Sequence, residues 1–289
     1  MAPFARHNDL RADFFLTMAR AFGPPIGLPV QRAFIGLLPQ DLAEMASGLG
    51  YPVEEALAAV SGEMASIEDP LRILQVYSGL FLTPPAPVHL STAVYLDGAV
   101  QGGSEYEMRQ WFARFGLSGG ARAGSLADHV DANLAFVGEL FARAHRAFEA
   151  DDSMEGLALA AEARRFLAAY PRRWLPPLRA ACARACADRC YPPIYLHLLD
   201  ILAGAMKAEI ARDAAKSAAA AVDSALPAGS SRGIGEPTAE DLAEIAFRLM
   251  AAGLSYDHVR KLPQWRDDTF ERRRAGGPLE GSIASQVVA

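Results

Sequence analysis

Apolar residues recur every three to four positions along most of the chain, which is the spacing of one face of an α-helix. Alternation of apolar and polar residues, which is typical of a half-buried strand, is scarce. Prolines and glycines separate the apolar segments, because proline cannot continue a helix beyond its first turn. We therefore predict an all-α protein with helices over residues 10–22, 40–49, 52–66, 70–83, 105–115, 126–148, 155–170, 178–190 and 194–210.

The second half of the chain holds one convincing linker, residues 227–237, with the sequence PAGSSRGIGEP. We predict one globular helical-bundle domain over residues 1–226, and a helical extension with a frayed tail over residues 238–289. Thr238 and Asp241 resemble a capping box that opens an amphipathic helix. The tail from Arg272 onward is expected to fray.

The composition fits a globular protein and argues against a nucleic-acid-binding function. The chain has 289 residues, of which 51% are hydrophobic and 21% charged, and its net charge is −6. That hydrophobic content is enough for a buried core. A general nucleic-acid binder needs a basic face to replace the counterions of phosphates, so we predict no nucleic-acid partner. An acidic surface suits a basic peptide.

The sequence contains no run of about 18 apolar residues, so we expect no transmembrane helix and no stable membrane insertion. Charged residues interrupt the first sixteen positions where a secretory signal would need an apolar core. The number of cysteines is odd, which fits a reducing compartment better than a disulfide framework. We therefore expect a cytoplasmic protein.

Candidate chemistry is sparse. Cys182, Cys186 and Cys190 lie at positions i, i+4 and i+8, and the outer two sulfurs are about 12 Å apart along a helix axis. One rigid helix cannot bring all three to one zinc ion, so we predict that they pack a helix face and hold no metal. No nucleophile, zinc-binding or phosphate-binding motif occurs. We expect no catalytic residues, no cofactor and no enzymatic activity.

One polar pair stands out, Asp128 with His129, which the pattern places in the first turn of a long helix capped by Ser125. A carboxylate there is favoured by the helix dipole, and facing outward it can accept two N–H donors from an arginine. From spacing alone, a role as a helix cap is the more common one. Both interpretations stay open.

The order of several motifs resembles the TorD/DmsD/NarJ-like redox-enzyme maturation chaperones. Members of that family commonly show a Tyr-x-x-Leu-Phe helix end, a proline-rich loop with Ser and Tyr, and an Asp-His pair opening a long helix. This chain has the corresponding residues Tyr77, Leu80, Phe81, Pro84, Pro85, Pro87, Ser91, Tyr95, Asp128 and His129. The resemblance extends from about residue 9, in the first helix, to about residue 212.

The resemblance implies a TorD-like helical bundle that binds the twin-arginine signal peptide, the apo form of a molybdopterin-containing oxidoreductase, or both. Such a chaperone assists cofactor insertion and delays export until maturation. The implied peptide-binding residues are Asp128 and His129 at the polar end, Ser91, and an apolar wall of Tyr77, Leu80, Phe81, Pro87 and Tyr95. The implied assembly is a monomer or a domain-swapped dimer.

The chain departs from the family pattern in two places. Ser125-Leu126-Ala127 stands where the family often has Glu-Pro-Asp or a similar segment before the Asp-His pair, and Asn133 stands where a glutamate is frequent one turn later. Two other classes of function stay open. One is a helical scaffold or regulatory adaptor that binds a partner through its C-terminal tail. The other is a helical enzyme that uses the cysteines as a metal site.

Overall fold

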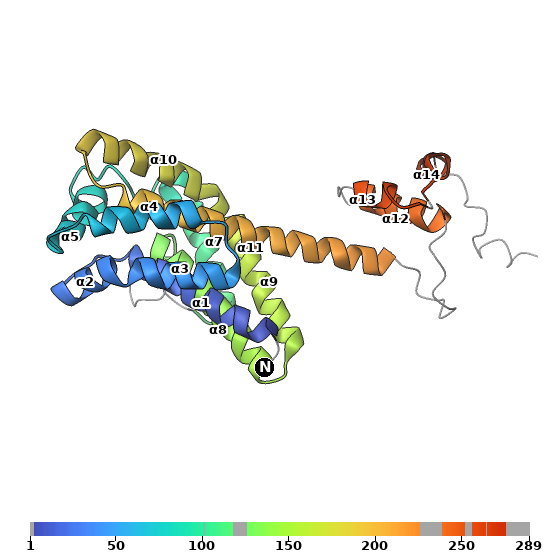
Figure 1. Ribbon diagram of the computed structural model, residues 1–289, viewed down its shortest axis with the longest axis horizontal. Coiled ribbons are helices and arrows are strands. Elements are labelled where there is room, and N and C mark those ends of the chain that lie inside the picture. The colour runs from blue at the N-terminus through green and yellow to red at the C-terminus, as the bar shows by residue number, and fades with distance from the viewer. Residues whose placement is uncertain are drawn as a thin grey trace, which may run out of the picture. The chain divides into compact units, whose positions relative to one another are not determined.

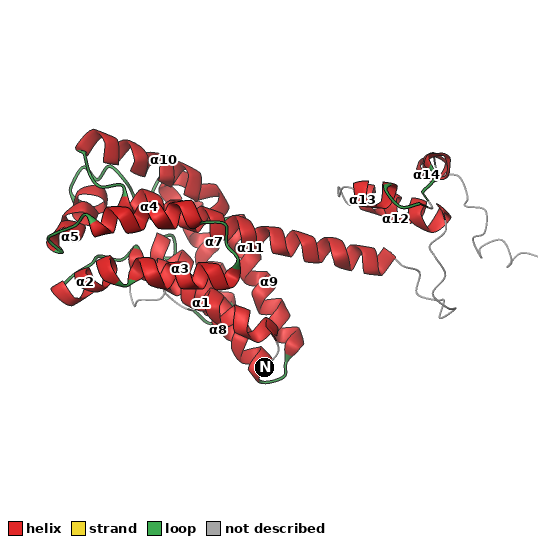
Figure 2. Cartoon of the chain, in the orientation of Figure 1, coloured by secondary structure: helices red, strands yellow, loops and turns green. Residues whose placement is uncertain are grey.

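The structure is a computed structural model made of helices joined by loops (Figure 2). It describes residues 3–100, 102–117, 126–225, 239–251, 256–263 and 265–275. Within these ranges there is no strand, and β-pairing is limited to one isolated bridge between Ser91 and His129. The predicted all-α fold is confirmed. No helix in the same ranges is long and apolar enough to cross a membrane.

The chain forms two compact units, residues Met1–Ala211 and Arg212–Ala289 (Figure 1). The helices that begin in the first unit are α1 Pro3–Ala21, α2 Leu28–Gly36, α3 Leu38–Leu49, α4 Glu54–Ala65, α5 Leu71–Tyr77, the π-helix η1 Ser78–Leu82, α6 Ala93–Leu96, α7 Gly103–Arg114, α8 Val130–Glu149, α9 Ser153–Ala169, α10 Pro171–Arg189 and α11 Ile194–Ala225. Those of the second unit are α12 Ala239–Ala251, α13 Asp257–Arg260 and α14 Asp267–Arg274. The predicted linker over residues 227–237 and the predicted caps Ser125 and Thr238 lie outside the described residues.

Helix α8 is the centre of the core of the first unit. All its residues from 132 to 138 are buried, and α1 and α9 pack against it. Helices α1 and α8 approach each other closely at Gly138. A Cβ added to this glycine would lie 2.7 Å from Cγ of Leu16 and 3.2 Å from the Ala12 carbonyl oxygen. A glycine is needed where two helix backbones come this near. The register of α1 on α8 is therefore closely defined.

Two elements differ from the sequence expectation. Helix α2 was not predicted, because it buries only Gln31 and Phe34 and so shows no apolar stripe. Helix α10 begins at Pro171 and runs through Pro176 and Pro177, where we expected a break. These prolines each remove a backbone donor. The burial of neighbouring Trp174 offsets that loss, so packing decides the outcome here over local propensity.

The second unit has a small apolar core of its own. Ala243, Ala246 and Phe270 are buried in it. The rings of Tyr256 and Trp265 lie 5.0 and 5.2 Å from that of Phe270. Helix α14 continues through Arg272, where we expected fraying to begin, because Phe270 anchors it on this cluster.

A buried carboxylate, that of Glu209 in α11, joins four segments of the first unit. It accepts hydrogen bonds from Arg11 Nε in α1 at 2.7 Å, from Arg164 Nε in α9 at 2.9 Å, and from the Tyr51 hydroxyl after α3 at 3.0 Å. The side chain of Glu209 is 0% exposed and those of Arg11 and Arg164 are 10% and 4% exposed. Both guanidinium groups also lie within 6 Å of the ring centre of Phe141 in α8. The network thus holds α1, α8, α9 and α11 together.

Substitution Glu209→Ala should lower the free energy of unfolding by about 3–5 kcal/mol, because it leaves two buried guanidinium groups without their partner. Urea unfolding followed by circular dichroism measures the loss. The matched control is Asp200→Ala, on the same helix, which removes only the exposed ion pair with Arg179. That change should cost less than about 1 kcal/mol. Equal losses for the two variants would contradict the interpretation.

Candidate peptide-binding site

The segment before α8 is held by a short backbone pairing with the loop after η1. The Thr92 amide donates to the Asp128 carbonyl at 2.6 Å, and the Val130 amide donates to the Leu90 carbonyl at 2.9 Å. Ser91 and His129 face each other in this bridge. The fold therefore brings Ser91, Asp128 and His129 together, although 36 residues separate Ser91 from Asp128.

The structure corrects the placement of Asp128. It precedes α8 rather than lying in its first turn, and its side chain is 0% exposed rather than facing outward. One carboxylate oxygen accepts a hydrogen bond from the Ser91 hydroxyl. The other, Oδ1, has no hydrogen-bond partner among the described residues. Asp128 is buried because the backbone pairing of residues 128–130 with residues 90–92 packs it against the loop after η1.

His129 is the residue immediately before α8 and has an extended backbone, so it too precedes the first turn. Its side chain is 32% exposed, and its Nδ1 lies 2.5 Å from Oδ1 of Asp131 in the first turn of the helix. The polar groups that a ligand can reach here are thus those of His129 and Asp131. Sequence reasoning missed Asp131, which the spacing Asp-His-x-Asp could have indicated.

Asn133, one turn into α8, is fully buried and makes structural hydrogen bonds. Its Nδ2 donates to the carbonyl oxygen of Ala127 at 2.6 Å and to that of His129 at 3.3 Å. Its Oδ1 accepts from Trp174 Nε1 at 3.2 Å. This residue therefore ties the segment before α8 to α8 and α10. The residue that departs from the family pattern fills a structural role in this chain.

The predicted apolar wall is corrected at three positions. Tyr77, Leu80 and Phe81 are buried in the core, where Tyr77 and Phe81 form edge-to-face pairs with the Tyr195 ring at 5.8 and 5.1 Å. They cannot form an exposed wall, because α5 and η1 turn these side chains toward the start of α11. Pro87 and Tyr95 are half-buried.

Tyr95 is also constrained. Its hydroxyl accepts a hydrogen bond from the backbone amide of His89 at 3.1 Å. Burial raises the pKa of this hydroxyl, so the side chain stays neutral at physiological pH. The residue braces the loop between η1 and α6.

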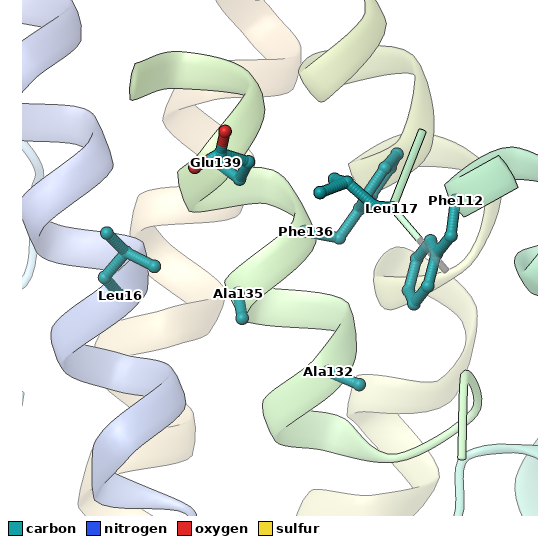
Figure 3. A pocket seen from close by; sticks show the side chains of 7 residues that line it. All are labelled: Leu16, Phe112, Leu117, Ala132, Ala135, Phe136 and Glu139. Carbon is teal, nitrogen blue, oxygen red and sulfur yellow. The ribbon is translucent and has the colours of Figure 1, made fainter. Parts of the chain in front are cut away.

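An apolar cavity of about 250 Å³ opens along α8, beginning one turn beyond His129 (Figure 3). It is lined by Leu16 of α1, Phe112 of α7, Leu117, and Ala132, Ala135, Phe136 and Glu139 of α8. Two alanines on the α8 side leave the space empty where larger side chains would fill it. The carboxylate of Glu139 already pairs with Arg143 and Arg146, at 2.8 and 3.0 Å. No sequence pattern indicated this cavity.

The cysteines do not converge. Cys182 and Cys186 are buried on α10, whereas Cys190 is exposed at the end of the helix in a left-handed conformation. A hydrogen bond with Cys186, together with burial, raises the pKa of the Cys182 thiol. No group of three or more metal-binding side chains occurs among the residues that the structure describes.

Residues 42–180 match the family model described as nitrate reductase delta subunit. The matched family is one of redox-enzyme maturation chaperones, and the match confirms the predicted resemblance over these residues. The match includes the Tyr77–Tyr95 segment and the Asp-His pair, but not α1. No curated protein and no solved structure matches the chain.

Proteins of the matched family are chaperones for the maturation of molybdenum enzymes. All three residues at the Ser91–Asp128–His129 junction lie inside the matched region.

Substitution Asn133→Asp should lower the free energy of unfolding by about 2–3 kcal/mol, because a carboxylate oxygen would replace the amide donor against the Ala127 carbonyl. Urea unfolding measures this loss. The matched control is Asn8→Asp, also buried, where the side-chain oxygen already accepts from Arg11 at 3.0 Å and can go on accepting. The assignment of Asn133 fails if the two variants unfold at the same urea concentration.

Proposed function

We propose that this protein is a cytoplasmic chaperone that binds the twin-arginine signal peptide, the apo form, or both, of a molybdenum-cofactor oxidoreductase. It assists cofactor insertion and delays export of its client until the cofactor is in place. It catalyses no reaction itself and holds no cofactor of its own. Its partner is the polypeptide of the client enzyme.

The observation that carries the proposal is the junction at the start of α8, within the region that matches the family. There the buried Asp128 carboxylate has an oxygen without a partner among the described residues. The partly exposed His129–Asp131 pair lies directly beside it in sequence. A buried carboxylate oxygen without a hydrogen bond is costly, so its presence supports a functional role for this junction.

The chemistry of a leader peptide suits this arrangement. Such a peptide has a basic part followed by an apolar stretch that can form a helix, and a helix docks by placing apolar side chains in a groove. The cavity along α8 supplies apolar surface that the predicted wall residues do not. The His129–Asp131 pair and the apolar cavity then lie along about three turns of the chain, residues 129–139.

Substitution His129→Ala should weaken the binding of a synthetic twin-arginine leader of a molybdenum enzyme about tenfold, since it removes the partly exposed ring and the partner of Asp131. Calorimetric titration measures the affinity. Ser91→Ala should have an effect of similar size, because it removes the hydrogen bond that orients Asp128.

The control for these variants is His197→Ala, which removes a partly exposed histidine from α11 and should leave the affinity unchanged. Thermal unfolding of each variant shows whether its fold is retained. If both site variants bind the leader as tightly as the wild type, this junction is not the contact point.

A further inference from the structure

Helix α1 carries a ridge that separates two hollows of opposite character. Asp13, Leu16, Thr17 and Arg20 follow one another at positions i, i+3, i+4 and i+7, so they share one face of the helix. Leu16 lines both hollows. On one side of it lies the apolar cavity against α8, and on the other lies a hollow of about 280 Å³ against α3.

The hollow against α3 is acidic. Its charged groups are the carboxylates of Asp13, Asp41 and Glu44 and the single guanidinium of Arg20. Among the described residues, none of the three carboxylates forms an ion pair within 4 Å. Burial, and next the nearby charge of Asp9, raises the pKa of the Asp13 carboxyl, although Arg20 and His145 act in the other direction. Negative charge is therefore left uncompensated on this side of the ridge.

The apolar side has no such uncompensated charge. Among the described residues that line it, Glu139 alone carries a carboxylate, which pairs with Arg143 and Arg146. Figure 3 shows Leu16 facing α8, with Ala135 and Ala132 on that helix and Phe112 and Leu117 on its far side. A basic group therefore finds no unpaired carboxylate among the described residues that line this cavity. An apolar side chain of leucine or phenylalanine size fits its volume.

We propose that the ridge at Leu16 is the docking site for the junction between the basic and the apolar parts of the leader peptide. The proposal rests on the proposed function and names the surface that reads the peptide. The arginines of the peptide lie over Asp41 and Glu44 on the α3 side. Its first large apolar side chain enters the cavity beside Ala135.

The dimensions agree with this orientation. Packed helices lie about 8–10 Å apart, so crossing α1 from one hollow to the other takes about one helix diameter. Two turns of a helical peptide, about seven residues, rise about 10.5 Å. A peptide whose apolar stretch begins within seven residues of its arginines can therefore fill both hollows at once.

The probe for a test is a synthetic 24-residue peptide with two consecutive arginines followed by a stretch of leucine and alanine. A second peptide carries two glutamines in place of the arginines. Two variants of the full chain alter one hollow each. Ala135→Leu fills the apolar cavity, and the double variant Asp41→Asn with Glu44→Gln removes charge from two exposed positions on α3.

Matched controls exist on α4, which lines neither hollow. Ala58→Leu makes the same change of side chain at an exposed position, and Glu54→Gln with Glu55→Gln removes two exposed charges from the first turn of a helix. Fluorescence anisotropy gives the affinities, and circular dichroism confirms the fold of each variant.

The proposal predicts that Ala135→Leu weakens both peptides about tenfold, because each loses its apolar anchor. The double variant on α3 should weaken the arginine peptide about five- to tenfold and leave the glutamine peptide unchanged. This dependence on the charge of the peptide is what a merely structural effect would not produce. The two control variants should bind like the wild type.

Three results would overturn the proposal. If the wild type binds the arginine peptide and neither hollow matters, the peptide docks elsewhere and the proposed function survives. If Ala135→Leu changes only the oligomer mass in light scattering, a second copy of the chain occupies the cavity. If the wild type binds no leader peptide at all, signal-peptide binding and the docking site both fail.

Discussion

The buried carboxylate of Glu209 is the interaction on which the rest of the first unit depends. It accepts three long-range hydrogen bonds, from Arg11 in α1, from Arg164 in α9 and from Tyr51, which follows α3. An isolated charge could not be buried at this depth, but two guanidinium groups and a hydroxyl satisfy it. The arginines in turn lie against the ring of Phe141 in α8. Charge and apolar packing thereby share one centre.

That centre determines where the candidate surfaces lie. Because Arg11 fixes the rotation of α1, Leu16 faces α8 and Asp13 lies at its other edge, beside α3. The close contact at Gly138 then sets how far α1 can slide. The ridge and its two hollows are therefore consequences of the packing of α1 against α8 and α3.

Most of the fold was predictable from the sequence, whereas most of the candidate site was not. Apolar periodicity located α8 and α11 because both bury continuous stripes. It missed α2, which buries almost no apolar surface, and it broke α10 at prolines that packing tolerates. Asp128 was assigned to a surface because its chemistry suits a ligand, and Tyr77 because the family resemblance implies an apolar wall. Only the bridge at Ser91 and the ring of Tyr195 show that both are buried, and these contacts join residues far apart in the sequence.

The same contacts distinguish residues that hold the start of α8 in place from residues that a ligand can reach, which the sequence pattern had grouped together. Asp128 and Asn133 hold the start of α8 in place, so they act on a ligand only through the position of His129 and Asp131. This joint lies within residues 42–180, the part that matches the family, whereas Leu16 and Asp13 lie outside it. Under the proposed function, discrimination among clients therefore falls to surfaces such as α1, where a chain can change its side chains without disturbing the joint.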